Sequence, residues 1–366
     1  MMRPTAPRSG PSFRIPYRLV SLTLGCALAA SPAFPCTTFC LRDSGRVVFG
    51  KNYDWNIGDG LLIVNPKGLL RTADSGDRPA RWTAKYGSVT FNQYGRDFPS
   101  GGMNEAGLAI ELMWLSDSRY PAPDTRHTVD VLQWIQYQLD TRATVAEVLA
   151  SDRNIRIAVG APIHYLVADR TGQVATVEFL NGRLIAHTGE RLPVAVLTND
   201  TYEKSLRYKR ELGARPSPED ERSLPRFART VDRVRGFATA QDGKANPVAY
   251  AFETLDRAAQ PSTRWSLVYE LDRLRVHFRT RERRQVRSVK LADLDFRCSQ
   301  PVRVLDLSAD VAGDVAKRLV PYERAANRRL VEIAYRGTPF LATTPQREIE
   351  RLARVPEAAT CRISGK

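Results

Sequence analysis

The segment Cys36-Thr37-Thr38-Phe39-Cys40 follows directly on a stretch with the composition of a removable export signal. Residues 1–35 contain four arginines and no acidic residue, with an apolar run at 19–30 and small residues at 31–33. A basic region, an apolar core and a small-residue cleavage site are typical of a secretory signal peptide. If the mature chain begins at Cys36, that residue carries both a thiol and a free α-amine, and a nucleophile stands at the start of the first strand.

A thiolate is a strong nucleophile, but the thiol needs a base to remove its proton. An α-amine titrates at about 7.7–8.0, so the amine of Cys36 is able to act as that base without a histidine. The alternative is that Cys36 is a small buried apolar residue at a strand start. Cleavage after Ala33 would leave Phe34-Pro35 ahead of Cys36, so a second trimming step is expected.

The export signal predicts a periplasmic or secreted protein. Leu24-Gly25-Cys26 leaves a lipoprotein open as an alternative, although Thr23 is a poor residue ahead of such a site. The apolar run at 19–30 is too short to cross a bilayer and no other segment could, so stable membrane insertion is not expected. The sequence is compatible with a homo-oligomer and does not determine the oligomeric state.

The formal net charge is +15, and many arginines alternate with apolar residues, as in 274–279. That alternation is typical of a half-buried strand with a solvated outer face. An exported protein rarely meets nucleic acid, so we interpret the charge as a basic surface and expect no nucleic-acid partner.

The four cysteines after the signal contain no CxxC pair: Cys36, Cys40, Cys298 and Cys361. The four histidines are scattered and lack metal-ligand spacing, so neither a metal nor a cofactor is expected: His127, His164, His187 and His277. In an oxidising compartment Cys298 and Cys361 could pair and tie the tail to the body of the protein. Two free buried thiols are the alternative.

The predicted elements run from strands to helices, back to strands and into a helical tail, which indicates the α+β class with antiparallel sheets and outer helices. Strands are expected through 36–182, with a hairpin turn at 43–45 and another turn at 101–107. A helix over 129–140 is expected to begin at a Thr128 cap, and Thr144 with Glu147 forms a capping box for the next. The later elements, in one domain over 36–366, are helices at 202–212, 226–237 and 247–259, strands at 265–271, 274–280 and 285–291, and a charged helical tail from about 309.

Cys36-Thr37 is followed by five short motifs: Gly50-Lys51-Asn52-Tyr53-Asp54, Met103-Asn104-Glu105-Ala106-Gly107-Leu108-Ala109, Leu197-Thr198-Asn199, Pro225-Arg226-Phe227-Ala228-Arg229 and Thr263-Arg264-Trp265-Ser266-Leu267-Val268-Tyr269. In their order and spacing they resemble the choloylglycine hydrolase and penicillin V acylase family. Its members are N-terminal-nucleophile hydrolases that cleave linear amide bonds. The resemblance covers most of 36–294 and implies a four-layer αββα sandwich of antiparallel sheets.

The resemblance gives Cys36 the role of nucleophile and Asp54 that of the carboxylate that holds its α-amine. Lys51 stands where the family has arginine; it keeps the positive charge but loses the bidentate fork. Arg226 takes the place of a second family arginine, and with Lys51 it would surround the thiol with positive charge. The alternative for Asp54 is a turn residue after a strand.

The resemblance also implies an oxyanion hole. Its first position falls on Trp114, where relatives carry Asn or Tyr. Because an indole offers only its own N–H, the expected donor is the backbone N–H of Trp114, with the ring lining the acyl pocket. The second donor is the side-chain amide of Asn199, which can be worth about 3 kcal/mol of barrier. The alternatives are a core residue for Trp114 and a cap of the helix at Tyr202 for Asn199.

Together these features predict hydrolysis of a linear amide in a small N-acyl compound, through an acyl-thioester on Cys36. Penicillin V, N-acyl homoserine lactones and conjugated bile salts are the substrate types that the resemblance implies. An acyltransferase with the same site and an exported amide-binding protein with an inactive site are the alternatives. A papain-like hydrolase needs a histidine partner, and no motif here places one.

Overall fold

The computed structural model describes residues 36–43, 45–239 and 246–362. The predicted export signal and the alternative at Cys26 lie outside the described residues. The described chain begins with a hairpin of β1 (Thr37–Asp43) and β2 (Arg46–Asp54). Gly45 in the connecting turn has a φ of 82°, which residues with a side chain rarely adopt, so the predicted turn is confirmed.

The β1–β2 hairpin lies within a seven-stranded sheet in the order β14-β1-β2-β15-β16-β17-β19. All neighbours in this sheet are antiparallel except β17 and β19, which are parallel. Its other strands are β14 (Val196–Leu197), β15 (Thr263–Glu270), β16 (Arg275–Thr280), β17 (Arg287–Lys290) and β19 (Gly313–Asp314).

A second, nine-stranded sheet is antiparallel throughout, in the order β13-β12-β11-β8-β7-β6-β3-β18-β20. Its strands are β3 (Leu61–Asn65), β6 (Ser88–Asn92), β7 (Pro99–Asn104), β8 (Ala109–Trp114), β11 (Ile163–Ala168), β12 (Val174–Leu180), β13 (Arg183–Thr188), β18 (Arg303–Asp306) and β20 (Val320–Pro321). Two small sheets pair β9 (His127–Asp130) with β10 (Ile155–Val159), and β4 (Leu69–Thr72) with β5 (Arg81–Thr83) and β21 (Thr360–Cys361).

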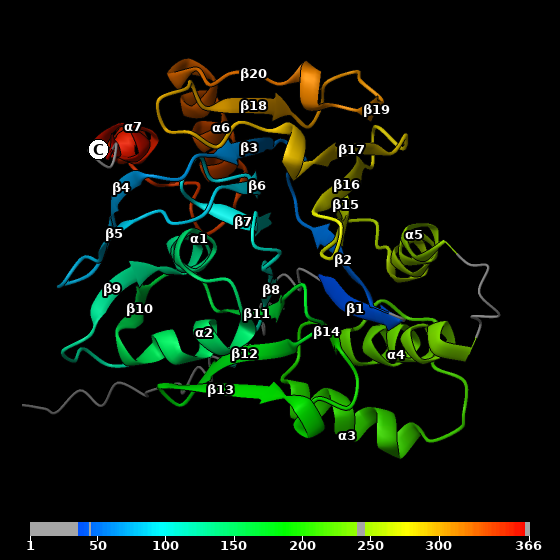
Figure 1. The fold of residues 1–366 in the computed structure, drawn as a ribbon. Helices are drawn as coiled ribbons and strands as arrows, with labels where there is room; N and C mark the ends of the chain where they lie inside the picture. The colour runs from blue at the N-terminus through cyan, green and yellow to red at the C-terminus, as the bar shows by residue number, and fades with distance from the viewer. Residues whose placement is uncertain (1–35, 44, 240–245, 363–366) are drawn as a thin grey trace, which may run out of the picture. The chain divides into compact units, whose positions relative to one another are not determined.

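Helices cover the outer faces of the two large sheets (Figure 1). On the seven-stranded sheet, α4 and α5 pack against β1 and β2; on the nine-stranded sheet, α1 packs against β7 and β8. The helices are α1 (Val131–Thr141), α2 (Val145–Ala150), α3 (Tyr202–Leu212), α4 (Ser223–Thr239), α5 (Pro247–Ala258), α6 (Arg324–Gly337) and α7 (Gln346–Arg354).

Buried apolar side chains join the two large sheets face to face. The ring of Phe91 on β6 lies 5.5 Å from that of Phe278 on β16 and 6.3 Å from that of Tyr269 on β15, in edge-to-face geometry. The structure therefore has two antiparallel sheets with helices on both sides, and the expected α+β class and αββα layering are confirmed.

The first helix begins two residues later than predicted. Thr128 is not its cap: residues 127–130 form β9, which pairs with β10, and the Thr128 hydroxyl donates to the Ser75 carbonyl at 3.0 Å. The cap is Asp130, whose carboxylate accepts from the Leu132 N–H at 2.7 Å. Pairing with a distant strand thus overrides a local capping signal. The capping box of Thr144 and Glu147 is confirmed.

The glycines at 101–102, predicted to lie in a turn, are inside strand β7. A Cβ at Gly101 would lie 2.2 Å from Cδ of Glu111, and one at Gly102 would lie 2.4 Å from the Val89 carbonyl oxygen. These glycines therefore permit a close approach between strands and do not mark a turn.

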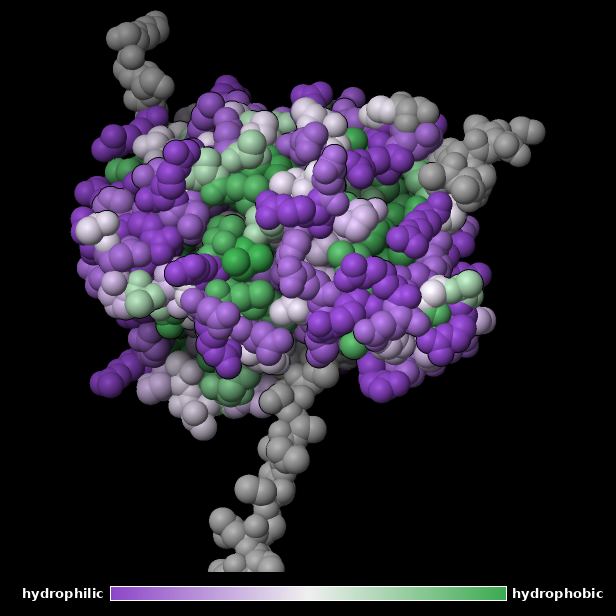
Figure 2. Space-filling view, turned by 90° about the horizontal axis from the view of Figure 1, so that it is seen from below, coloured by the Kyte–Doolittle hydropathy of each residue, from purple (hydrophilic) through white to green (hydrophobic). Residues whose placement is uncertain are grey.

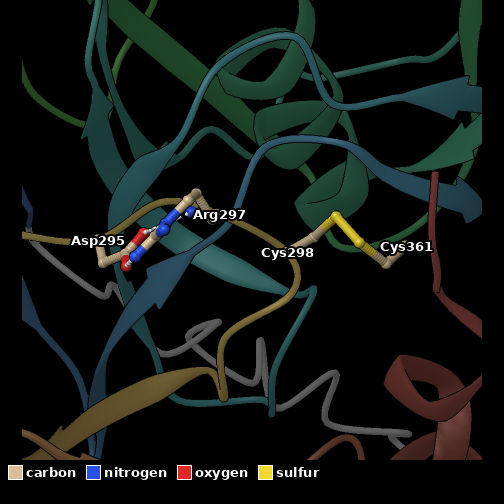
Figure 3. The surroundings of a disulfide bond; sticks show 4 residues. All are labelled: Asp295, Arg297, Cys298 and Cys361. Atoms are coloured by element: carbon tan, nitrogen blue, oxygen red, sulfur yellow. Dashed lines mark hydrogen bonds and ion pairs between the residues drawn. A yellow bond between two sulfur atoms is a disulfide. The ribbon is translucent and has the colours of Figure 1, made fainter. Parts of the chain in front are cut away.

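The tail is not helical from about 309, because short strands β19 and β20 there extend the edges of the two large sheets. Helices begin only at α6 and continue in α7. Cys298 and Cys361 form a disulfide, so the pairing that the sequence left open is present (Figure 3).

Figure 2 shows that one face of the surface is mostly hydrophilic, with hydrophobic side chains gathered in a few patches.

Candidate active site

Cys36 lies immediately before β1, beside the end of β2. The residue is buried, and its Sγ lies 3.8 Å from the backbone carbonyl of Asp54. Burial raises the pKa of the Cys36 thiol above its ordinary value, and the charge of Lys51 is the strongest influence in the opposite direction. The pairing of β1 with β2 therefore brings together the three residues that the first two motifs singled out.

The Asp54 carboxyl group is completely buried at the end of β2. Oδ1 accepts a hydrogen bond from the hydroxyl of Thr263 on β15, while Oδ2 has no partner among the described residues. Burial raises the pKa of the Asp54 carboxyl to about 7. Burying a carboxylate oxygen without a hydrogen-bond donor costs free energy. We therefore expect Oδ2 of Asp54 to accept a hydrogen bond from a group outside the described contacts.

Lys51 is buried between the two large sheets, and its ammonium group donates to the backbone carbonyl of Leu112 on β8. The nearby Glu111 carboxyl is buried too and accepts from the hydroxyl of Tyr269. Burial raises the pKa of Glu111 to about 7, and the charge of Lys51 opposes that rise. Lys51 is thus a fixed buried cation, not a solvated strand residue.

Arg226 on α4 links Cys36 to Asn199. Its guanidinium donates to the Cys36 carbonyl at 3.1 Å, to the Thr37 hydroxyl at 2.9 Å and to Oδ1 of Asn199 at 2.5 Å. The amide nitrogen of Asn199 in turn donates to the Trp114 carbonyl at 2.9 Å. Oδ1 is therefore fixed as an acceptor, which turns the amide N–H groups of Asn199 toward β8.

A cavity of about 440 Å³ reaches Cys36, and several aromatic side chains lie in its wall. Its rings include Tyr53, Trp55, Tyr94, Trp114 and Phe340. The Trp114 ring lies 6.3 Å from that of Trp55 and 5.7 Å from that of Phe340. The structure therefore places the Trp114 ring in the cavity wall, as the sequence suggested, beside its carbonyl contact with Asn199.

Trp55 and Phe340 are among the cavity residues that sequence reasoning missed. The alternation of Lys51, Tyr53 and Trp55, which continues the period of β2, was a signal that could have found Trp55. Phe340 follows α6 and carries no such signal, because only the fold brings it to Trp114.

Three comparisons with known proteins agree with this geometry. Residues 36–231 match the family model described as "Linear amide C-N hydrolases, choloylglycine hydrolase family". The chain belongs to this family. Members of the choloylglycine hydrolase family act on linear amide bonds, so the chain is a linear amide C–N hydrolase, and the resemblance inferred from the motifs is confirmed.

A penicillin V acylase of Pectobacterium atrosepticum is one relative of this chain. The two sequences are 27% identical over 327 residues, and the match covers 76% of this chain and 85% of the relative. The structure of a penicillin V acylase from Agrobacterium tumefaciens matches with a TM-score of 0.69 at 28% identity, covering 79% of this chain and 98% of that one. A conjugated bile acid hydrolase variant from Clostridium perfringens matches in fold, with a TM-score of 0.64 at 17% identity over 76% of this chain and 98% of that one.

No helix in the described residues is long and apolar enough to cross a membrane. Within the same part of the chain, no group of three or more His, Cys, Asp or Glu side chains is arranged to hold a metal ion.

Proposed function

We propose that the protein hydrolyses the amide bond of small N-acyl compounds, with Cys36 as an N-terminal nucleophile in an exported, trimmed chain. Penicillin V is the first substrate to test, because the relatives from Pectobacterium and Agrobacterium are named penicillin V acylases. N-acyl homoserine lactones and conjugated bile salts are the other two types to test. We place the protein in the periplasm or outside the cell.

In the proposed mechanism the Cys36 thiol gives its proton to its own α-amine, and the thiolate attacks the amide carbonyl. The amide of Asn199 and the backbone N–H of Trp114 donate to the oxyanion. The protonated amine then gives its proton to the leaving nitrogen, which departs as the free amine. The same amine activates a water molecule, which releases the acid from the thioester and restores the thiol.

The observation that carries this proposal is the buried Oδ2 of Asp54, which has no donor among the described residues. Asp54 is also the residue whose backbone carbonyl contacts the Cys36 thiol. A free α-ammonium group on Cys36 would supply the missing donor and a compensating positive charge. The carboxylate would then hold the amine and raise its pKa.

N-terminal sequencing of exported, active protein is expected to return Cys36 as the first residue. The reason is that the proposed base exists only after Phe34-Pro35 is removed. Active protein that begins at Phe34 or earlier would exclude the mechanism. Fractionation of the producing cells tests the location with the same sample.

Replacing Lys51 by alanine is expected to shift the pH profile of Cys36 alkylation to higher pH and to lower turnover at neutral pH. Burial already raises the pKa of this thiol, and Lys51 is the strongest opposing influence, so its removal should raise that pKa further, with the charge of Arg226 still opposing the rise. Lys51→Arg keeps the charge and serves as the matched control, with an alkylation profile close to that of the wild type. Superimposable profiles for wild type and Lys51→Ala would show that Lys51 does not tune the thiol.

A further inference from the structure

We propose that the loop at 338–345, between α6 and α7, is a lip that selects uncharged, apolar acyl groups for the cavity. This inference rests on the proposed function and adds a substrate preference to it. The loop lies outside residues 36–231, which the family model matches.

Phe340 is the central residue of the lip. Its ring lies 5.7 Å from that of Trp114, which in turn lies 6.3 Å from the ring of Trp55, and all three line the cavity that reaches Cys36. Even so, 51% of Phe340 is exposed. An apolar acyl group that is bound at Cys36 and extends along these rings would cover the exposed face of Phe340. Apolar surface that is exposed in the free protein would then be buried against the acyl group.

The lip is attached at both ends. On the α6 side, the hydroxyl groups of Tyr94 and Thr338 are 2.9 Å apart, and the Tyr94 ring packs edge-on against Tyr335. On the α7 side, the Arg351 guanidinium donates to both carboxylate oxygens of Asp74, at 2.5 and 2.8 Å. The loop is therefore a positioned wall of the cavity.

The chain beyond α7 is fastened to the body of the protein. Strand β21 pairs with β4, and the Arg362 N–H donates to the Gly68 carbonyl at 2.8 Å. The Cys298–Cys361 disulfide, drawn in Figure 3, joins residues 63 positions apart. That covalent loop encloses α6, the lip and α7, so it restricts the freedom of the whole segment.

The charges at the cavity explain why the preferred acyl group is uncharged. Three carboxylates line it, from Asp74, Asp130 and Glu348, against one lining guanidinium, that of Arg351. Arg351 is already paired with Asp74 and Glu348. An acyl chain with a terminal carboxylate would therefore meet like charges, with no uncommitted cation among these residues.

The test compares Phe340→Ala with wild type on acetyl, hexanoyl, phenoxyacetyl and adipoyl amides of one chromogenic amine. Hexanoyl and adipoyl groups have the same chain length and differ in a terminal carboxylate. Wild type is expected to hydrolyse the hexanoyl amide faster than the adipoyl amide. In Phe340→Ala, kcat/KM for the hexanoyl and phenoxyacetyl amides should fall about tenfold, mainly through KM, while the acetyl amide is unaffected.

Ile333→Ala is the matched control, because Ile333 is 43% exposed on α6 and does not line the cavity. It should match wild type on every amide. If Phe340→Ala changes kcat/KM equally for the acetyl and hexanoyl amides, or changes neither, the proposed role of the lip is wrong. It is also wrong if wild type hydrolyses the adipoyl amide as fast as the hexanoyl amide. If wild type hydrolyses none of the amides, or Cys36→Ser hydrolyses them equally well, the proposed function fails instead.

Discussion

Replacing Cys36 by serine is expected to lower the hydrolysis of N-acyl compounds by roughly a thousandfold or more, as loss of a nucleophile does in other covalent hydrolases. Serine is close to cysteine in size, and the Cys36 thiol contacts the Asp54 carbonyl at 3.8 Å. The fold should therefore persist, with an unchanged thermal unfolding midpoint. The measurement is kcat on the best amide substrate. Phe34-Pro35 would be retained on this variant if trimming depends on the Cys36 thiol.

Cys40→Ser provides the matched control for this variant. Cys36 and Cys40 are the free cysteines of the described chain, both are buried, and each thiol lies 3.8 Å from a backbone carbonyl. Burial raises the pKa of Cys40 to about 12, and Cys40 does not line the cavity. Cys40→Ser should keep activity near that of wild type. An active Cys36→Ala variant would exclude the nucleophile assignment.

Replacing Asp54 by asparagine is expected to lower turnover by roughly a hundredfold or more, because the amine would lose the charge that orients it. Asparagine preserves the shape and can still accept from the Thr263 hydroxyl, so the loss would report on charge. Without the carboxylate the pKa of the α-amine falls, and the limb of the pH–rate profile that reports the base should move to lower pH.

Thr263→Val is the graded comparison for Asp54→Asn. It removes the hydroxyl that donates to Asp54 but leaves the carboxylate in place. A smaller loss of turnover is expected, with the amine still held. If Asp54→Asn, trimmed to Cys36, turned over substrate at the wild-type rate, Asp54 would be a structural residue only. N-terminal sequencing of the variant separates a catalytic defect from a failure of trimming.

The part of the site nearest the nucleophile could be predicted from the sequence. Cys36 directly precedes β1, Lys51 and Asp54 lie on β2, and the apolar runs of these two strands and the turn at Gly45 are local signals. The tight turn fixes the register of the two strands, so local signals suffice to bring the three residues together. Asn199 and Arg226 were found through short motifs, and in the structure Arg226 contacts both the Cys36 carbonyl and Oδ1 of Asn199.

The other contacts of the candidate site could be found only in the tertiary structure. The donor to Asp54 comes from Thr263 on β15, and Lys51 reaches a carbonyl on the opposite sheet. Phe340 reaches Trp114 from the loop after α6. These contacts join residues far apart in sequence, and pairing across such distances leaves no periodic trace in either segment.

The same reasoning explains where local interpretation was wrong. Thr128 lies in a strand because β10 pairs with it, and Gly101 lies in a strand because Glu111 needs the space of its missing side chain. The sequence by itself thus determined the hairpin that follows Cys36 and the α+β class, since the signals for both lie in neighbouring residues; the role of Cys36 as nucleophile stays a prediction. Only the tertiary structure decided the aromatic cavity and its lip, because burial and pairing between distant segments outweigh local preference.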